Sequence, residues 1–113
     1  MIIERFEWDQ HKSDTLFRLR GFDLEFASRM FEADTIEFED RRQDYGERRV
    51  VAVGRVDKVH LTVVYTDRAA TQDRVVRRLI TAWRSNPRER VRYEAAIRTG
   101  TVESGTGEPG MAS

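Results

Sequence analysis

The sequence has 113 residues, the length of one domain, and contains no cysteine, which excludes disulfides and thiolate metal sites. Its 20 basic and 20 acidic residues balance, but residues 1–47 hold 13 acids and 7 bases whereas residues 48–98 hold 5 acids and 13 bases. No apolar run approaches the ~20 residues that span a bilayer, and the N-terminus lacks a signal-peptide pattern, so a cytoplasmic protein without membrane contact is expected.

Hydrophobic periodicity predicts elements in the order strand, helix, helix, four strands, helix. Alternating or short β-branched apolar runs indicate strands at residues 2–8, 35–39, 48–56, 59–66 and 73–81. Helical spacing indicates three helices: residues 10–20, a second helix that follows Asp23 and includes Phe31, and residues 87–97. A loop is expected at Arg68–Gln72 and a tight hairpin turn at Asp57-Lys58. Two helices before a largely antiparallel sheet indicate the α+β class.

Cap residues mark the ends of the predicted helices. Asp9 and Asp23 are suitable N-caps for the first two helices, and Gly21 is a suitable residue after the first. Asn86, followed by proline and then by Glu89, predicts a capping box at the last helix. Residues 1–98 are therefore expected to form a single domain. Residues 99–113, rich in Gly, Ser, Thr, Glu and Pro, are expected to be a disordered tail.

The basic residues suggest a polyanionic partner. All but Lys12 and Lys58 are arginine, 18 in number. Arginine forks match phosphate geometry and stack on bases, so their concentration after residue 47 suits RNA. High-GC codon usage would also enrich arginine, and that alternative stays open.

Three blocks of sequence carry a family resemblance. The first is Phe6–Lys12, FEWDQHK; the second runs from Asp44 through Glu47-Arg48 to the VYTDR segment ending at Arg68; the third runs from Arg78 to Glu94. Together they resemble the BrnT family, which has a Trp-Asp-x-x-Lys opening, a Glu-Arg turn, a Val-Tyr-Thr-x-Arg strand and a Glu-Arg-x-x-Tyr-Glu last helix. The resemblance covers roughly residues 6–94.

This resemblance implies a RelE-like fold and a ribonuclease toxin of a type II toxin–antitoxin pair. Such a toxin cleaves RNA to arrest growth and is neutralised by a BrnA-type antitoxin. The antitoxin is also a DNA-binding repressor, so operator DNA is expected to be contacted only through it. No cofactor or metal is expected, because the sequence has no Gly-rich phosphate loop and no credible spacing of metal ligands.

The candidate catalytic residues are Glu47, Arg48, Arg68 and Arg78. The three arginines fall on or just beyond strands that are expected to be neighbours, where they would grip the scissile phosphate and stabilise transition-state charge. Glu47 would act as a general base or hold Arg48 in position. A purely structural ion pair on the sheet face is the alternative.

The candidate RNA-binding residues are Lys12, Arg20, Arg55 and Trp83. Lys12 would contact phosphate or be a solvated helix residue. Arg20, at the C-terminus of its helix, would interact favourably with the helix dipole whether or not it binds RNA. Trp83 would stack on a base or pack under the last helix. His11 and His60 have no clear partner in the sequence and are expected to be structural.

The chain also departs from the family pattern. An Asn-x-x-Lys-His-Gly segment of the family is represented here by Leu16, Leu19, Arg20 and Gly21, and Trp83 stands where the family has arginine. Because a His and an Arg suited to RNA cleavage are replaced, a second hypothesis is a degenerate toxin-like protein that binds an antitoxin or nucleic acid without cleaving RNA. A third is a small nucleic-acid-binding or partner-regulating domain unrelated to toxins.

Overall fold

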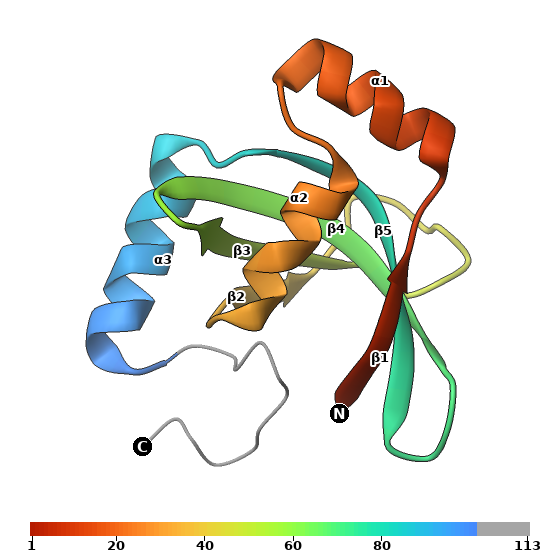
Figure 1. The fold of residues 1–113 in the computed structure, drawn as a ribbon. Helices are drawn as coiled ribbons and strands as arrows, with labels where there is room; N and C mark the ends of the chain where they lie inside the picture. The colour runs from red at the N-terminus through yellow and green to blue at the C-terminus, as the bar shows by residue number, and fades with distance from the viewer. Residues whose placement is uncertain (102–113) are drawn as a thin grey trace.

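The computed structural model describes residues 1–101 and has the α+β class that the sequence predicts (Figure 1). Within these residues the strands are β1 (Ile2–Glu7), β2 (Ile36–Glu39), β3 (Val50–Val56), β4 (Val59–Ala69) and β5 (Arg74–Arg84). The helices are α1 (Gln10–Arg20), α2 (Leu24–Ser28), the 3₁₀ helix η1 (Arg29–Glu32) and α3 (Pro87–Thr99). The predicted disordered tail lies outside the described residues from 102 onward, whereas Thr99 belongs to α3.

The predicted helix caps are confirmed. Asp9, Asp23 and Asn86 each accept an amide proton from the first turn of their helix, and Glu89 completes the capping box of α3. Gly21 ends α1 with a φ of 81°, in the left-handed region that favours glycine. These local signals fix where the helices begin and where the first one ends.

The sheet is largely antiparallel, as predicted, but it is mixed, because its first strand runs parallel to its neighbour. Its strand order is β1-β5-β4-β3-β2, and every pair is antiparallel except β1 with β5, which run parallel. The N-terminal strand thus pairs with a strand some seventy residues away, from Ile2 opposite Arg74 to Glu7 opposite Arg78. Alternation marks β1 as a strand, but it carries no information about the partner or the direction.

Several predicted boundaries were wrong. The expected loop at Arg68–Gln72 is partly strand, because β4 continues to Ala69 and the Ala70 amide donates to the Arg74 carbonyl at 2.9 Å. β5 continues to Arg84, which places Trp83 within a strand. The second helix ends at Ser28, so Phe31 lies in η1.

The sheet has two differently covered faces. On one face, α1, α2 and η1 cover a core that includes Leu24, Met30, Leu61, Val63 and Tyr65. Figure 1 shows α2 in front of the sheet and α3 to one side, where α3 packs on β3. Side chains alternate between faces along a strand, so the neighbours of the core residues in β4 and β5 point to the opposite face. The candidate site lies on that opposite face.

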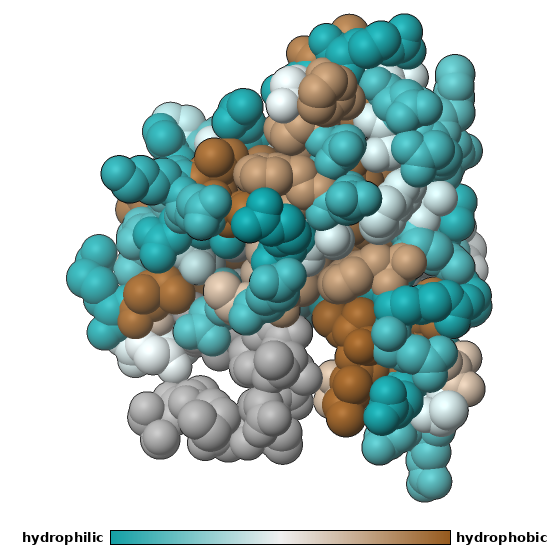
Figure 2. Space-filling model, in the orientation of Figure 1, coloured by the Kyte–Doolittle hydropathy of each residue, from teal (hydrophilic) through white to brown (hydrophobic). Residues whose placement is uncertain are grey.

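The surface seen from the α1 and α2 side is mainly hydrophilic. Figure 2 shows teal side chains over most of this face, with a brown apolar patch beside the start of β1. Ile2 of that strand is an exposed large hydrophobic residue. None of the helices in residues 1–101 combines the length and the apolarity that a bilayer-spanning helix needs.

Candidate functional site

The four residues predicted to be catalytic line a single pocket. This pocket, of about 370 Å³, is called the arginine pocket below and is lined by Glu47, Arg48, Thr66, Asp67, Arg68, Val76 and Arg78. The expectation that the three arginines come from neighbouring parts of the sheet is confirmed, because β3, β4 and β5 are consecutive in it.

Strand register brings the arginines together. Arg78 of β5 pairs with Thr66 of β4, and Arg68 lies two residues further along β4 on the same face. The Thr66 hydroxyl donates to the Arg48 carbonyl at 2.8 Å, which fixes the segment before β3 against β4. The three arginine side chains remain 47–72% exposed, so an anionic ligand can reach them.

Glu7 is a residue of this site that the sequence analysis missed. Its carboxylate pairs with the Arg68 guanidinium, with Nη2 of Arg68 at 3.2 Å from Oε2, and it lies 3.9 Å from Nη1 of Arg78. The hydrogen bond from Arg68 and the nearby arginine charges hold the pKa of Glu7 below its usual range. The block Phe6–Lys12 contained Glu7, but only the parallel pairing of β1 with β5 places it here.

The expected contact between Glu47 and Arg48 is not formed. Glu47 instead lies 3.2 Å from Nε of Arg49, whereas Nε of Arg48 lies 3.8 Å from Glu39. Glu47 still lines the pocket and is a carboxylate that can accept a proton from a bound ligand.

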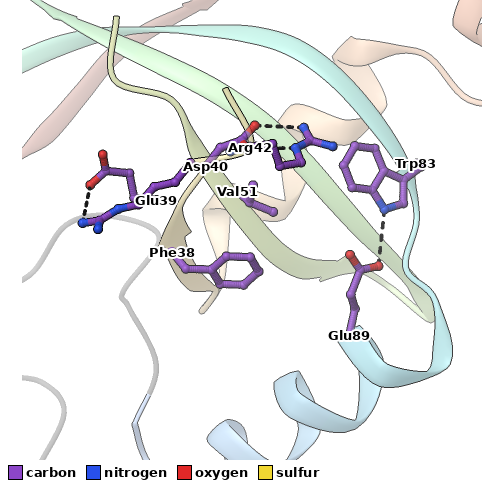
Figure 3. Close-up of a pocket in the computed structure, with 8 residues that line it drawn as sticks. Phe38, Glu39, Asp40, Arg42, Val51, Trp83 and Glu89 are labelled. Atoms are coloured by element: carbon purple, nitrogen blue, oxygen red, sulfur yellow. Dashed lines mark hydrogen bonds and ion pairs between the residues drawn. The ribbon is translucent and has the colours of Figure 1, made fainter. Parts of the chain in front are cut away.

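A second pocket holds Trp83. This pocket, of about 240 Å³, is called the Trp83 pocket and is lined by Phe38, Glu39, Asp40, Arg41, Arg42, Val51, Trp83 and Glu89 (Figure 3). The indole Nε1 of Trp83 donates to Glu89 at 3.3 Å, so the side chain contacts the start of α3, yet it also lines an opening. Both interpretations of Trp83 from the sequence remain compatible with this position.

An ion pair between the exposed Arg42 and the buried Asp40 shapes the side of the Trp83 pocket away from α3. Arg42 donates to both oxygens of Asp40, from Nε at 2.9 Å and from Nη2 at 2.8 Å. The Asp40 side chain is 1% exposed. The hydrogen bonds from Arg42, joined by one from the Tyr45 hydroxyl, lower the pKa of Asp40 to about 2. The Arg42 guanidinium is therefore held at the pocket by a carboxylate that stays ionised.

The other RNA-binding candidates lie elsewhere. Arg55 is 3.5 Å from Glu94 of α3, which also lies 2.8 Å from the Nε2 atom of His60. This gives His60 a partner that the sequence did not reveal, and its hydrogen bond lowers the pKa of Glu94. Arg20 donates to the Ala82 carbonyl at 2.9 Å, and Lys12 is exposed on α1. The structure does not bring these residues into either pocket.

A match to a known protein family covers most of the chain. A family model described as "Ribonuclease toxin, BrnT, of type II toxin-antitoxin system" matches residues 8–89, well over half of the sequence. The matched segment contains all the residues that line the arginine pocket and the Trp83 pocket. No match was found among curated proteins. In the described part of the chain, no group of three or more His, Asp and Glu side chains is arranged to hold a metal ion.

Proposed function

Since the chain belongs to the BrnT family of ribonuclease toxins of type II toxin–antitoxin systems, we propose that it cleaves RNA in the arginine pocket. The observation that carries this proposal is the convergence of Arg48, Arg68 and Arg78 on one pocket from separate parts of the sheet. Three guanidinium groups within one pocket match the charge of a phosphodiester and of its more highly charged transition state. We also propose that the fold is RelE-like.

The proposed reaction uses the pocket residues in distinct roles. The 2′-oxygen of the substrate attacks the adjacent phosphorus, and its proton passes to the Glu47 carboxylate. The bond from phosphorus to the 5′-oxygen then breaks, and that oxygen takes a proton from Glu47 or from water. The products are a 2′,3′-cyclic phosphate and a 5′-hydroxyl. The arginines, which stay protonated, neutralise the charge on the phosphorane oxygens, so the proposed reaction needs no metal ion or cofactor.

The proposed partners follow from the family. A BrnA-type antitoxin would neutralise the toxin, and operator DNA would be bound only through that antitoxin. The substrate would be cytoplasmic RNA, which makes the cytoplasm the proposed location. RNA contacts outside the arginine pocket are proposed for Lys12, Arg20 and Arg55, because all three side chains are exposed.

The proposal is tested by cleavage of purified RNA and by growth after induced expression. Arg68→Ala is expected to lower the cleavage rate by about 10²–10³, as the loss of one transition-state donor typically does. Arg18→Ala is the matched control, because Arg18 is exposed on α1 and its side chain hydrogen-bonds only to Thr15 among the described residues. Equal activity of the wild type and Arg68→Ala would contradict the assignment of the pocket.

A second candidate function, binding without cleavage, is favoured by the positions of the histidines. His60 pairs with Glu94 and His11 is exposed on α1, so within the described residues no histidine lines the arginine pocket. Histidine is the usual proton carrier at neutral pH. Intact RNA and normal growth with folded wild-type protein would support this candidate. Toxicity gained by Arg20→His with Trp83→Arg would then show that catalysis had been lost at those positions.

A further inference from the structure

The Trp83 pocket and the arginine pocket lie on the same face of the sheet, because Trp83 pairs with Thr62 and Arg78 with Thr66, at alternate positions of β4. Glu39 lines the Trp83 pocket and Arg48 lines the arginine pocket, and the two side chains are 3.8 Å apart. An RNA strand whose phosphate lies at Arg48 can therefore continue along this face toward a second, differently lined hollow. The two pockets together offer separate places for a phosphate and for a base of the same strand.

Aromatic side chains frame the Trp83 pocket. Phe38 and Trp83 are both half-buried, and Val51 beside them is buried and apolar. Figure 3 shows Phe38, Trp83 and Glu89 around one opening, with the Val51 side chain beside Phe38. The hydrogen bond from Trp83 to Glu89 restricts rotation of the indole. A restrained indole and a second aromatic ring around a hollow are typical of sites where nucleic-acid bases stack.

The polar groups at this opening have unused hydrogen-bonding capacity. Oε1 of Glu89 accepts from the Asn86 amide at 2.8 Å and from Trp83, whereas Oε2 has no hydrogen bond among residues 1–101. Arg42 uses Nε and Nη2 to hold Asp40, and its Nη1 group has no partner among those residues. The pocket therefore presents one charged acceptor and one charged donor.

We propose that the Trp83 pocket binds a guanine base of the RNA whose phosphate lies in the arginine pocket, an assignment that rests on the proposed function. Guanine presents two adjacent N–H donors, N1–H and N2–H, that fit the Glu89 carboxylate, and acceptors at O6 and N7 that fit Arg42. Adenine lacks the O6 acceptor and the N1–H donor. Trp83 would supply the stacking surface, so this departure from the family pattern gives the chain a base preference.

Intrinsic tryptophan fluorescence of the whole protein tests base recognition without requiring cleavage. Titration with GMP is expected to quench the emission, with binding about tenfold tighter than that of AMP, CMP or UMP, since each of these lacks at least one charge-assisted hydrogen bond. Trp83→Phe should abolish the quenching while Trp8 still fluoresces. Equal binding of all four nucleotides, or quenching that persists in Trp83→Phe, would overturn the proposal.

Glu89→Gln is the decisive variant because glutamine preserves the capping box. It replaces the Oε2 acceptor with an amide donor, so GMP binding should weaken about tenfold while AMP binding stays unchanged. Glu25→Gln, at an exposed position of α2 on the other side of the sheet, is the matched control and should bind GMP normally. Unchanged GMP binding in Glu89→Gln would contradict the role of Glu89.

A non-cleavable 2′-O-methyl oligonucleotide with one guanine separates an RNA site from a free-nucleotide site. The oligonucleotide should bind about tenfold tighter than GMP, and Arg48→Ala should remove most of that gain, because the neighbouring phosphate contacts are lost. Equal affinity for GMP and the oligonucleotide would assign the pocket to a free nucleotide and overturn its assignment to RNA. Cleavage without guanine binding would refute only this inference, whereas guanine binding without cleavage would refute only the proposed function.

Discussion

Glu7 at the end of β1 reaches across the β5 strand to pair with Arg68 on β4. The same carboxylate lies 3.9 Å from Arg78, which is its direct neighbour in the parallel β1–β5 register. One acidic side chain thus holds two of the three guanidinium groups of the arginine pocket. Both arginines remain about half exposed, so the pairing orients them without removing them from solvent.

Replacing Glu7 with glutamine is therefore expected to reduce RNA cleavage more than stability. The arginines would lose their common anchor, and misplacement of such groups by about 1 Å costs up to about 10² in rate. Because pairing with Arg68 lowers the pKa of Glu7, the anchor is present above the ordinary carboxylate pKa and is lost as the pH falls through the lowered value. Cleavage by the wild type should fall at acid pH.

Rates measured against pH for the wild type and for Glu7→Gln check this prediction. Glu4→Gln is the matched control, since Glu4 on the same strand pairs only with the neighbouring Arg5 among the described residues. An unchanged rate in Glu7→Gln, with the fold intact, would show that the arginines need no anchor.

Arg77 is expected to be a structural arginine, unlike its neighbour Arg78. It donates to both oxygens of Asp67, at 2.9 Å and 2.8 Å, and its guanidinium lies 3.8 Å from the Tyr65 ring centroid and 5.0 Å from that of Phe31. Arg77→Ala should lower the free energy of unfolding by about 2–4 kcal/mol, because it removes these ring contacts and leaves Asp67 unpaired.

Urea unfolding of Arg77→Ala and of the control Arg74→Ala checks this prediction. Arg74 begins the same strand and is exposed, so its loss should change stability by no more than about 0.5 kcal/mol. Similar losses in the two variants would mean that the aromatic contacts of Arg77 contribute little.

The sequence predicted the parts of this fold that depend on local chemistry. Helix caps such as Asp9 and Asn86 act within one turn, so their residues reveal them directly. The proximity of Arg48, Arg68 and Arg78 also followed from strands that succeed one another in the chain. Sequence-adjacent strands usually pair as neighbours, which makes such a site accessible to prediction.

The contacts that were missed are those between distant segments. Glu7 joins the site only through the parallel pairing of the first strand with the last, and Glu94 meets His60 only because α3 folds back onto the sheet. No residue pattern within either segment specifies its distant partner. The end of β4 was missed because Thr66 is followed by the charged Asp67 and Arg68, and only the small Ala69 comes after them.

Gly54 in β3 is expected to be required for packing of the sheet against η1. A Cβ atom at this position would lie 3.0 Å from Cγ2 of Thr35 and 3.2 Å from Sδ of Met30, both of which are fully buried. Gly54→Ala should therefore destabilise the protein by about 1–3 kcal/mol, as overpacking of a core does. The shift of the urea unfolding midpoint measures this effect. An equal or higher midpoint in Gly54→Ala would show that the Met30 side chain moves aside without loss of packing.

Asp40 is expected to contribute pH-dependent stability beside the Trp83 pocket. Its pKa falls from 3.8 to about 2, chiefly through the hydrogen bonds from Arg42. A lowered folded-state pKa stabilises the fold above the ordinary value, and this stabilisation is lost as the pH falls from 3.8 toward 2. Asp40→Asn, which keeps the shape but not the charge, should therefore be less stable than the wild type at neutral pH.

The difference in unfolding free energy between Asp40→Asn and the wild type should be constant from pH 7 to about pH 5 and shrink below about pH 4. Asp44→Asn is the matched control in the same loop, because its exposed side chain receives only the Gly46 amide, at 2.9 Å, and asparagine can accept it too. The unfolding free energy of Asp44→Asn should equal that of the wild type at every pH measured. A stability difference for Asp40→Asn that does not change with pH would show that the Arg42 pairing depends on shape and hydrogen bonding rather than on the charge of Asp40.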